Sequence, residues 1–345
     1  MNDAPRRSGI DAAWLASRQE AIIDPALPIC DPHHHLWDYP SSRYLLPELL
    51  TDIGGGHNVE RTVFVECGAF YRAAGPSEFR PIGETEFVNG VAAMAASGRY
   101  GKVLACAGIV GYADLMRGAA VESVLSAHVV AGNGRFRGIR HAAAWDASDQ
   151  VRNSHTNPPR DLFHQPAFRE GFGKLSQHGL SFDVWLYAPQ LADVIDLAHA
   201  FPDQPIALDH VGGPVGIGPY SGRQSEIFPA WQRAIRELAS CPNIHVKLGG
   251  LGMKSCGFDF DKRPMPPSSD ELAAAWRPYI ETCIDSFGVT RCMFESNFPV
   301  DKTSCSYTTL WNAFKRLAAG ASSDEKAALF RDTAMRFYRL GGEGP

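Results

Sequence analysis

Short apolar runs rich in β-branched residues recur along the chain, and longer segments with a helical period of apolar positions separate them. The runs have the length of buried strands and stand roughly forty residues apart. We expect eight strands, at residues 29–33, 62–67, 103–110, 138–141, 181–186, 206–211, 244–248 and 292–295.

Amphipathic stretches fill most of the intervals between these runs. In residues 84–97, Phe87, Val88, Val91 and Met94 lie on one stripe of a helix. The last stretch is preceded by Ser322 and Glu325, whose spacing is that of a capping box. Helices are expected at residues 11–21, 84–97, 120–131, 168–178, 188–200, 228–240, 271–287, 306–319 and 323–340.

Eight strands alternating with helices predict an α/β fold, a parallel (β/α)8 TIM barrel. A doubly wound sheet is the alternative, but it should carry a Gly-rich turn after its first strand, where this chain has three histidines. Three long segments, 67–83, 142–167 and 249–270, each follow a strand, so they should lie over the catalytic face. We expect a tail with a short helix in residues 1–27 and a single barrel domain in residues 28–345.

Composition narrows the class of function. The formal net charge is -5 and no Lys/Arg-rich run occurs, which argues against a nucleic-acid partner. No apolar stretch has the length of a membrane span, and the first residues lack the apolar core of a signal peptide. The eight cysteines form no CxxC pair, which fits reduced thiols. We therefore expect a cytoplasmic protein that acts on a small molecule.

The first strand ends in three consecutive histidines. A strand alternates its side chains between two faces, so His33 and His35 should point the same way and His34 the opposite way. Two imidazoles on one face can chelate a metal ion or hold one substrate.

The other strands of the predicted barrel also end in polar residues, where catalytic groups of such barrels lie. Neighbouring side chains of a strand point to opposite faces. If His210 points into the barrel, Asp209 should face the helices, and we expect the same of Glu295. Lys247 is expected either to point into the barrel or to bridge to Asp209. Histidines away from the strands are expected at the surface: His57, His128, His155, His164, His178 and His199. The polar strand-end residues are His33, His35, Glu66, Arg140, His141, Asp183, Asp209, His210, Lys247, Glu295, Asn297 and Asp301.

Three motifs together resemble the amidohydrolase superfamily: residues 31–37 (DPHHHLW), 208–213 (LDHVGG) and 294–299 (FESNFP). The resemblance is to the amidohydrolase-related, lactonase-type branch, which includes 2-pyrone-4,6-dicarboxylate lactonase and 4-sulfomuconolactone hydrolase. It spans the chain from residue 29 to the terminal helix and implies a distorted barrel. It also implies that His33 and His35 ligate a divalent metal or bind the substrate carbonyl, and that His210 polarises that carbonyl.

The chain departs from the family pattern at the eighth strand, where relatives carry an aspartate that ligates metal and activates water. Asn297 stands at that position and can neither accept a proton nor offer a charged ligand. Glu66 and Asp301 are the candidate replacements as base, and Glu66 or Asn297 would complete a metal site with His33 and His35. One divalent metal, zinc or manganese, and metal-independent catalysis both stay open.

Arginines near the expected catalytic face suggest an anionic substrate. Arg140 and His141 follow strand four, Arg72 and Arg223 are loop candidates, and Tyr220 could line the pocket. We expect a hydrolase that opens a small anionic or sugar-derived lactone. The alternatives are a metal-dependent nonoxidative decarboxylase of an aromatic or unsaturated acid and a non-catalytic, ligand-binding barrel. A homodimer is a further expectation, because barrels of this kind often pair through their helices.

Overall fold

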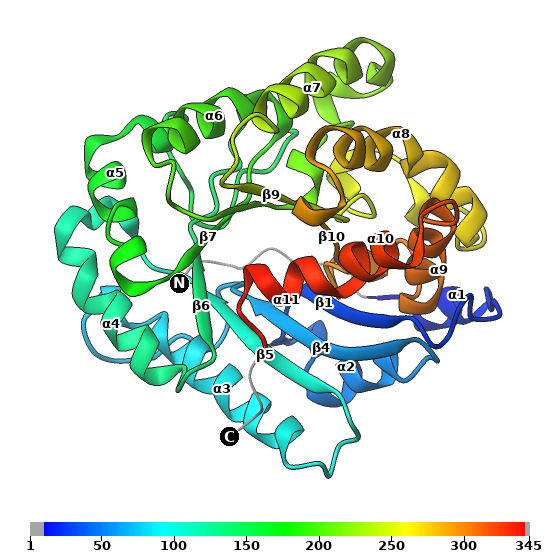
Figure 1. Cartoon of the computed structure of the whole chain (residues 1–345), viewed down its shortest axis with the longest axis horizontal. Helices are drawn as coiled ribbons and strands as arrows, with labels where there is room; N and C mark the ends of the chain where they lie inside the picture. Colours follow the sequence, from blue (N-terminus) through cyan, green and yellow to red (C-terminus); the bar gives the residue numbers. More distant parts are fainter. Residues whose placement is uncertain (1–9, 342–345) are drawn as a thin grey trace.

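In this computed structural model, which describes residues 10–341, eight parallel strands form one sheet in which neighbouring strands follow chain order. Helices surround the sheet, so the (β/α)8 prediction is confirmed (Figure 1). The strands are β1 (Pro28–His34), β4 (Asn58–Val65), β5 (Leu104–Gly111), β6 (Phe136–Arg140), β7 (Ser181–Val184), β8 (Ile206–Leu208), β9 (Ile244–Leu248) and β10 (Cys292–Phe294).

The barrel closes irregularly between its first and last strands. The segment after β10 makes the contact, through a bridge between His34 and Phe298. His35 N–H donates to the Phe298 carbonyl at 2.7 Å, and Asn297 N–H donates to the His33 carbonyl at 2.9 Å. These bonds hold the two motif-bearing segments side by side.

All eight expected strands exist, but several end earlier than the apolar pattern suggests. β8 stops at Leu208 rather than at 211, because His210 and Val211 adopt positive φ angles of 55° and 48°. A left-handed backbone cannot continue a strand. The chain therefore turns at His210, which places this histidine at the mouth of the barrel.

The expected helices are present with shifted ends, and the stretch 323–340 is divided by a π-helical turn at Ala328–Asp332. The helix expected at 11–21 is one short turn, and the tail preceding residue 10 lies outside the described residues. The helices are α1 (Ala12–Ala16), α2 (Leu46–Ile53), α3 (Ile82–Ala96), α4 (Glu122–Ala131), α5 (Pro166–Phe172), α6 (Leu191–Ala200), α7 (Gln224–Leu238), α8 (Ser269–Phe287), α9 (Tyr307–Leu317), α10 (Ser323–Ala327) and α11 (Thr333–Phe337).

The capping box expected before α10 is present, because Glu325 N–H donates to Ser322 Oγ and Ser322 N–H donates to the Glu325 carboxylate. The sequence pattern did not indicate α2 or the preceding hairpin of β2 (Trp37–Tyr39) and β3 (Ser42–Tyr44). These elements lie between β1 and β4, where we expected no regular structure.

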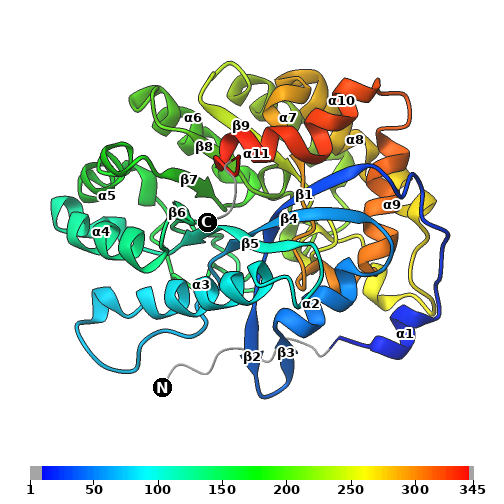
Figure 2. The ribbon, with the colours of Figure 1, turned by 60° about the horizontal axis from the view of Figure 1, so that its bottom comes forward.

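The two ends of the barrel differ. At one end Phe337 of α11 and the following Tyr338 form one buried cluster with Cys30, Val63 and Met293 of the strands. Figure 2 shows the β2–β3 hairpin extending from the other end, where β1 leads into it. No helix within residues 10–341 has the length and apolar character needed to cross a membrane. All eight cysteines are free and buried.

Candidate active site at the strand ends

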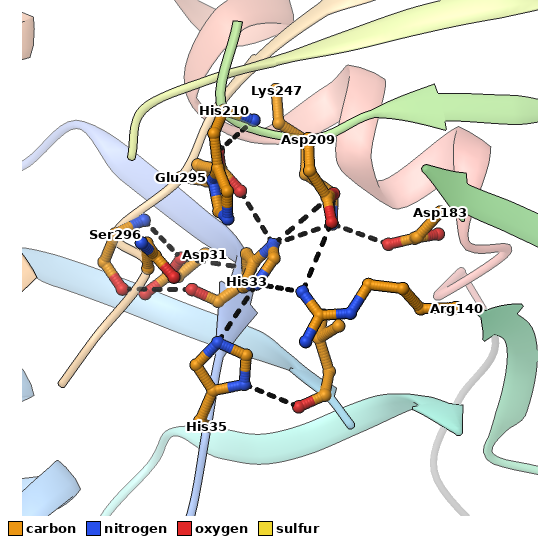
Figure 3. Close-up of polar contacts among 12 residues, drawn as sticks. Asp31, His33, His35, Arg140, Asp183, Asp209, His210, Lys247, Glu295 and Ser296 are labelled. Atoms are coloured by element: carbon orange, nitrogen blue, oxygen red, sulfur yellow. Dashed lines mark hydrogen bonds and ion pairs between the residues drawn. The ribbon is translucent and has the colours of Figure 1, made fainter. Parts of the chain in front are cut away.

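The three histidines that end β1 divide between two faces, as alternation predicts. His34 points away from the other two, and its Nε2 lies 2.8 Å from Thr62 Oγ1. Burial lowers the pKa of His34 to about 3, so this imidazole is neutral. His33 and His35 point together, with their Nε2 atoms 3.3 Å apart (Figure 3).

Three imidazoles meet at the mouth of the barrel, and the Nδ1 atom of each lies near an oxygen acceptor. His35 Nδ1 is 2.7 Å from the Val65 carbonyl. His210 Nδ1 and His33 Nδ1 lie 2.6 Å and 2.9 Å from the two oxygens of Glu295. An Nδ1–H that donates to such an acceptor leaves Nε2 with a lone pair, which is the neutral form that binds metals or accepts protons.

These residues fit a divalent metal. Within residues 10–341, one group of three potential ligands has its atoms within 4.8 Å of one another: His33, His210 and Glu295. The close Nε2 atoms of His33 and His35 also repel each other when both carry lone pairs, and a bound cation removes that repulsion. In metal sites, a carboxylate that accepts hydrogen bonds from two histidines commonly orients them toward the metal.

Glu295 and Asp209 point inward, contrary to our expectation that both face outward. Alternation fixes side-chain direction only in extended strands. β10 ends at Phe294, and the backbone turns at His210, so neither carboxylate follows the strand rule. Glu295 also accepts the backbone N–H of His210 at 3.0 Å, which fixes the turn that carries this histidine.

A buried ionic network lies beneath the histidines (Figure 3). Lys247 Nζ lies 2.6 Å from Asp183 and 3.0 Å from Asp209, so it both points into the barrel and bridges to Asp209. The same amine is 3.1 Å from His33 Nδ1. Burial and the nearby Lys247 lower the pKa of His33. Burial opposes ionisation of Asp209, but Lys247 and His33 hold the pKa of this carboxyl well below its usual range.

Glu66, at the end of β4, is fully buried and uses both carboxylate oxygens. Arg140 Nε donates to one oxygen at 2.8 Å, and His155 Nε2 lies 3.0 Å from the other. Burial raises the pKa of Glu66, but His155 and Arg140 outweigh it and set that pKa to about 2. Glu66 does not join the described three-ligand group, so its predicted ligand role gains no support from the geometry.

Asn297 and Asp301 are joined to each other. Asn297 Nδ2 donates to one oxygen of Asp301 at 2.8 Å, and Gly252 N–H donates to the other at 2.9 Å. Burial raises the pKa of Asp301 to about 7, although His210 nearby lowers it. Asn297 lines the cavity described next, whereas Asp301 is buried behind it.

A cavity of about 630 Å³ opens above these groups. Its wall includes His35, His210 and Arg140 from the strand ends, with Arg152, His155 and Lys254 from two of the long loops. Trp185 and Tyr187 add aromatic surface. Among the described residues that line the cavity there is no aspartate or glutamate. The wall is therefore suited to an anionic or electron-rich ligand.

Four residues predicted to bind substrate are not brought to this cavity. Arg72 pairs with Glu86, and Arg223 pairs with Glu226, both at the surface. Tyr220 donates its hydroxyl to Asp146 at 2.6 Å. His141 is buried between Tyr112 and Phe168, and burial lowers its pKa to about 4. Their predicted contacts with substrate stay predictions without geometric support.

Three cavity residues were missed by sequence reasoning. His155 was expected at the surface and is 37% exposed, but its place on the cavity wall was not predicted, and Arg152 and Lys254 were not considered. All three lie in segments 142–167 and 249–270, which the sequence did place over the catalytic face. The polar residues of those two segments were therefore the signal from which these cavity residues could have been predicted. His57 and His128, also expected at the surface, are buried.

The chain was compared with known proteins. The amidohydrolase family matches residues 30–340. The uncharacterized protein y4mH of Sinorhizobium fredii is 35% identical over 90% of this chain and 98% of its own length. An L-fucono-1,5-lactonase of Burkholderia multivorans is 27% identical over 90% of this chain and 95% of its own. A crystal structure of an amidohydrolase from Burkholderia multivorans with bound zinc has a TM-score of 0.68 at 24% identity, covering 90% of this chain and 99% of that one.

Proposed function

Because this chain belongs to the amidohydrolase family, we propose that it hydrolyses the ring ester of a small anionic lactone. The relatives support this reaction class, since L-fucono-1,5-lactonases from two Burkholderia species cover 95% of their own length in the match. Those relatives are 25% and 27% identical, which leaves room for a different lactone in this cavity.

The single observation that carries the proposal is the charge of the cavity wall. Arg140, Arg152 and Lys254 line it together with His35 and His210, and the described lining contains no carboxylate. A lactone needs its carbonyl polarised as the oxygen gains charge, and a substituent carboxylate needs a cation to bind it. The histidines can polarise the carbonyl, and the arginines can bind the carboxylate.

His35 and His210 both reach the cavity, whereas His33 lies directly beneath them. We assign the polarisation of the scissile carbonyl to this group. His33 and His210, with Glu295 or His35 as the third ligand, would hold a divalent metal, which when bound would act as a Lewis acid on that carbonyl. Glu295 orients two of the three imidazoles whether or not a metal is bound.

Neither base candidate from the sequence fits its role well. Glu66 has a pKa of about 2 and both oxygens occupied, so it accepts a proton poorly near neutral pH. Asp301 has a suitable pKa of about 7 but is held by Asn297 and Gly252 behind the wall. The group that takes the proton from water must be sought elsewhere on the wall.

Acid release from lactones tests the proposed reaction. The purified protein is incubated in a weakly buffered pH-indicator assay with uncharged sugar lactones such as L-fucono-1,5-lactone and with an anionic lactone, 2-pyrone-4,6-dicarboxylate. We expect turnover of an anionic lactone, and loss of at least about 10²-fold in His210→Ala, which lacks a group that polarises the carbonyl.

A parallel assay follows CO₂ release from aromatic and unsaturated carboxylic acids. CO₂ release without lactone hydrolysis would replace the proposal with the decarboxylase alternative, and inertness to both panels with tight binding of one compound would favour a binding protein. Metal analysis of the protein, before and after dialysis against a chelator, then shows whether activity follows bound metal.

A further inference from the structure

His155 occupies a position on the cavity wall that no expectation assigned to it. Its side chain is 37% exposed and lines the same cavity as His35, His210 and Arg140. It comes from the long loop after β6. It is therefore a histidine open to substrate and water, beside groups that polarise a carbonyl.

The loop holds His155 in place by bonds on both sides of it. Ser154 N–H donates to the Ala144 carbonyl at 2.8 Å, and Ala144 N–H donates to Ser154 Oγ at 3.1 Å. On the other side, Thr156 Oγ1 donates to the Ala142 carbonyl at 2.6 Å. Both partners lie just beyond the end of β6, so the loop returns to the barrel rim at this residue.

The imidazole is oriented by a buried carboxylate. His155 Nε2 lies 3.0 Å from Glu66, which is fully buried and ionised, with Arg140 on its other oxygen. Nε2 therefore carries the hydrogen and donates it, and Nδ1 keeps the lone pair. A histidine backed by an ionised carboxylate is the arrangement of a general base.

We propose that His155 is the general base and acid of this site, replacing the aspartate that Asn297 cannot supply. The inference rests on the proposed lactone hydrolysis. Nδ1 takes a proton from water as the water oxygen forms a bond to the carbonyl carbon. The ring C–O bond then breaks, its electron pair stays on the leaving oxygen, and that oxygen takes the proton from His155. Glu66 stabilises the imidazolium that exists between the two transfers.

Other ionisable and charged groups surround this imidazole. Glu66, directly after β4, faces it, and His155 in turn adds to the effect of burial in lowering the pKa of His141, directly after β6. The cations that line the same cavity are Arg140, Arg152 and Lys254. Asp301 is the competing base, because its pKa of about 7 also suits the task.

The test compares His155→Gln with His164→Gln in the full-length protein, using the lactone that the wild type turns over fastest. His164 lies in the same long segment, at the surface beside Asp193, and is the matched control. We expect kcat of His155→Gln to fall by about 10²–10⁴-fold with KM changed by less than about threefold, as for loss of a general base. The control should keep the wild-type kcat.

The pH profile separates a base from a residue that only supports the fold. In the wild type, kcat/KM should fall toward acid pH as the base takes up a proton, and this limb should vanish in His155→Gln but persist in Asp301→Asn. A His155→Gln enzyme with wild-type kcat, or with reduced kcat and an unchanged acid limb, overturns the inference. A wild type that hydrolyses no lactone overturns the proposed function and this inference with it.

Discussion

The centre of this site, at the strand ends, and the part of the cavity wall that the loops form differ in how their charges are stabilised. At the centre, Lys247, Asp183 and Asp209 have no exposed surface, so every charge there needs a partner within the protein. On the wall, Lys254 pairs with Asp261 but is half exposed, and Arg152 is exposed, so water also stabilises their charges. Changes at the centre should therefore alter stability and the histidines, whereas changes to the exposed cations of the wall should alter substrate binding alone.

The largest effect is expected for Lys247→Met. It leaves Asp183 and Asp209 buried without their shared cation, which should lower the free energy of unfolding by about 3–5 kcal/mol. Urea unfolding followed by circular dichroism measures this. Lys262→Met, at a surface pair with Asp259, is the control and should leave the unfolding midpoint unchanged. Equal midpoints for the two variants would show that the buried pairs of Lys247 matter no more for stability than a surface pair.

The second effect concerns Glu295, which holds His33 and His210 from behind. Glu295→Gln keeps the shape but cannot accept hydrogens from both imidazoles. We expect kcat or metal affinity to fall about 10–100-fold, the usual cost of losing such a partner. Steady-state kinetics and metal analysis of the variant check this. Wild-type kcat and wild-type metal affinity in this variant would mean that Glu295 is not needed to orient the imidazoles.

The third effect is a stability maximum at mildly acidic pH. Glu66 and Glu295 have pKa values lowered from 4.5 to about 2 by their partners, despite burial, so the stability they contribute is lost as pH falls from 4.5 toward 2. Burial raises the pKa of Asp31 to about 6 and that of Glu84 to about 8. Their contribution is present below about 4 and is lost as pH rises through these values.

Urea unfolding at a series of pH values between 2 and 9 tests this prediction. The midpoint should be highest at about pH 4 to 4.5 and decline on both sides. Glu84→Gln should reduce the decline on the alkaline side, because the amide stays neutral where the carboxyl must ionise. An alkaline decline of the same size in wild type and variant would show that Glu84 does not cause it.

The smallest effect is expected on the wall, for Arg152→Gln. KM for an anionic lactone should rise about two- to fivefold, which corresponds to one exposed ionic contact, with kcat and the unfolding midpoint unchanged. Added salt should raise the wild-type KM and affect the variant less. The salt series with an uncharged lactone is the control. A drop in stability in Arg152→Gln would assign this arginine to the centre instead.

Sequence reasoning located the barrel and the centre of the site, because both depend on local pattern. The eight apolar runs became the eight strands, and the paired direction of His33 and His35 followed from strand alternation. The same rule failed for Asp209 and Glu295, which lie where the strands end and the backbone turns. Strand position also set Arg140, at the end of a strand, apart from the loop candidate Arg72, and only Arg140 lines the cavity.

What the sequence by itself determined is therefore the fold, the family and the histidines at the strand ends, since period, spacing and motif are properties of neighbouring residues. What only the tertiary structure decided is the partner of each ionisable group. Glu66 meets His155 from a loop 89 residues away, and Glu295 meets His210 from a strand 85 residues away. Such pairs form because a buried charge must find an opposite charge or a hydrogen bond wherever the fold provides one. That choice depends on distances in space, which sequence order does not record.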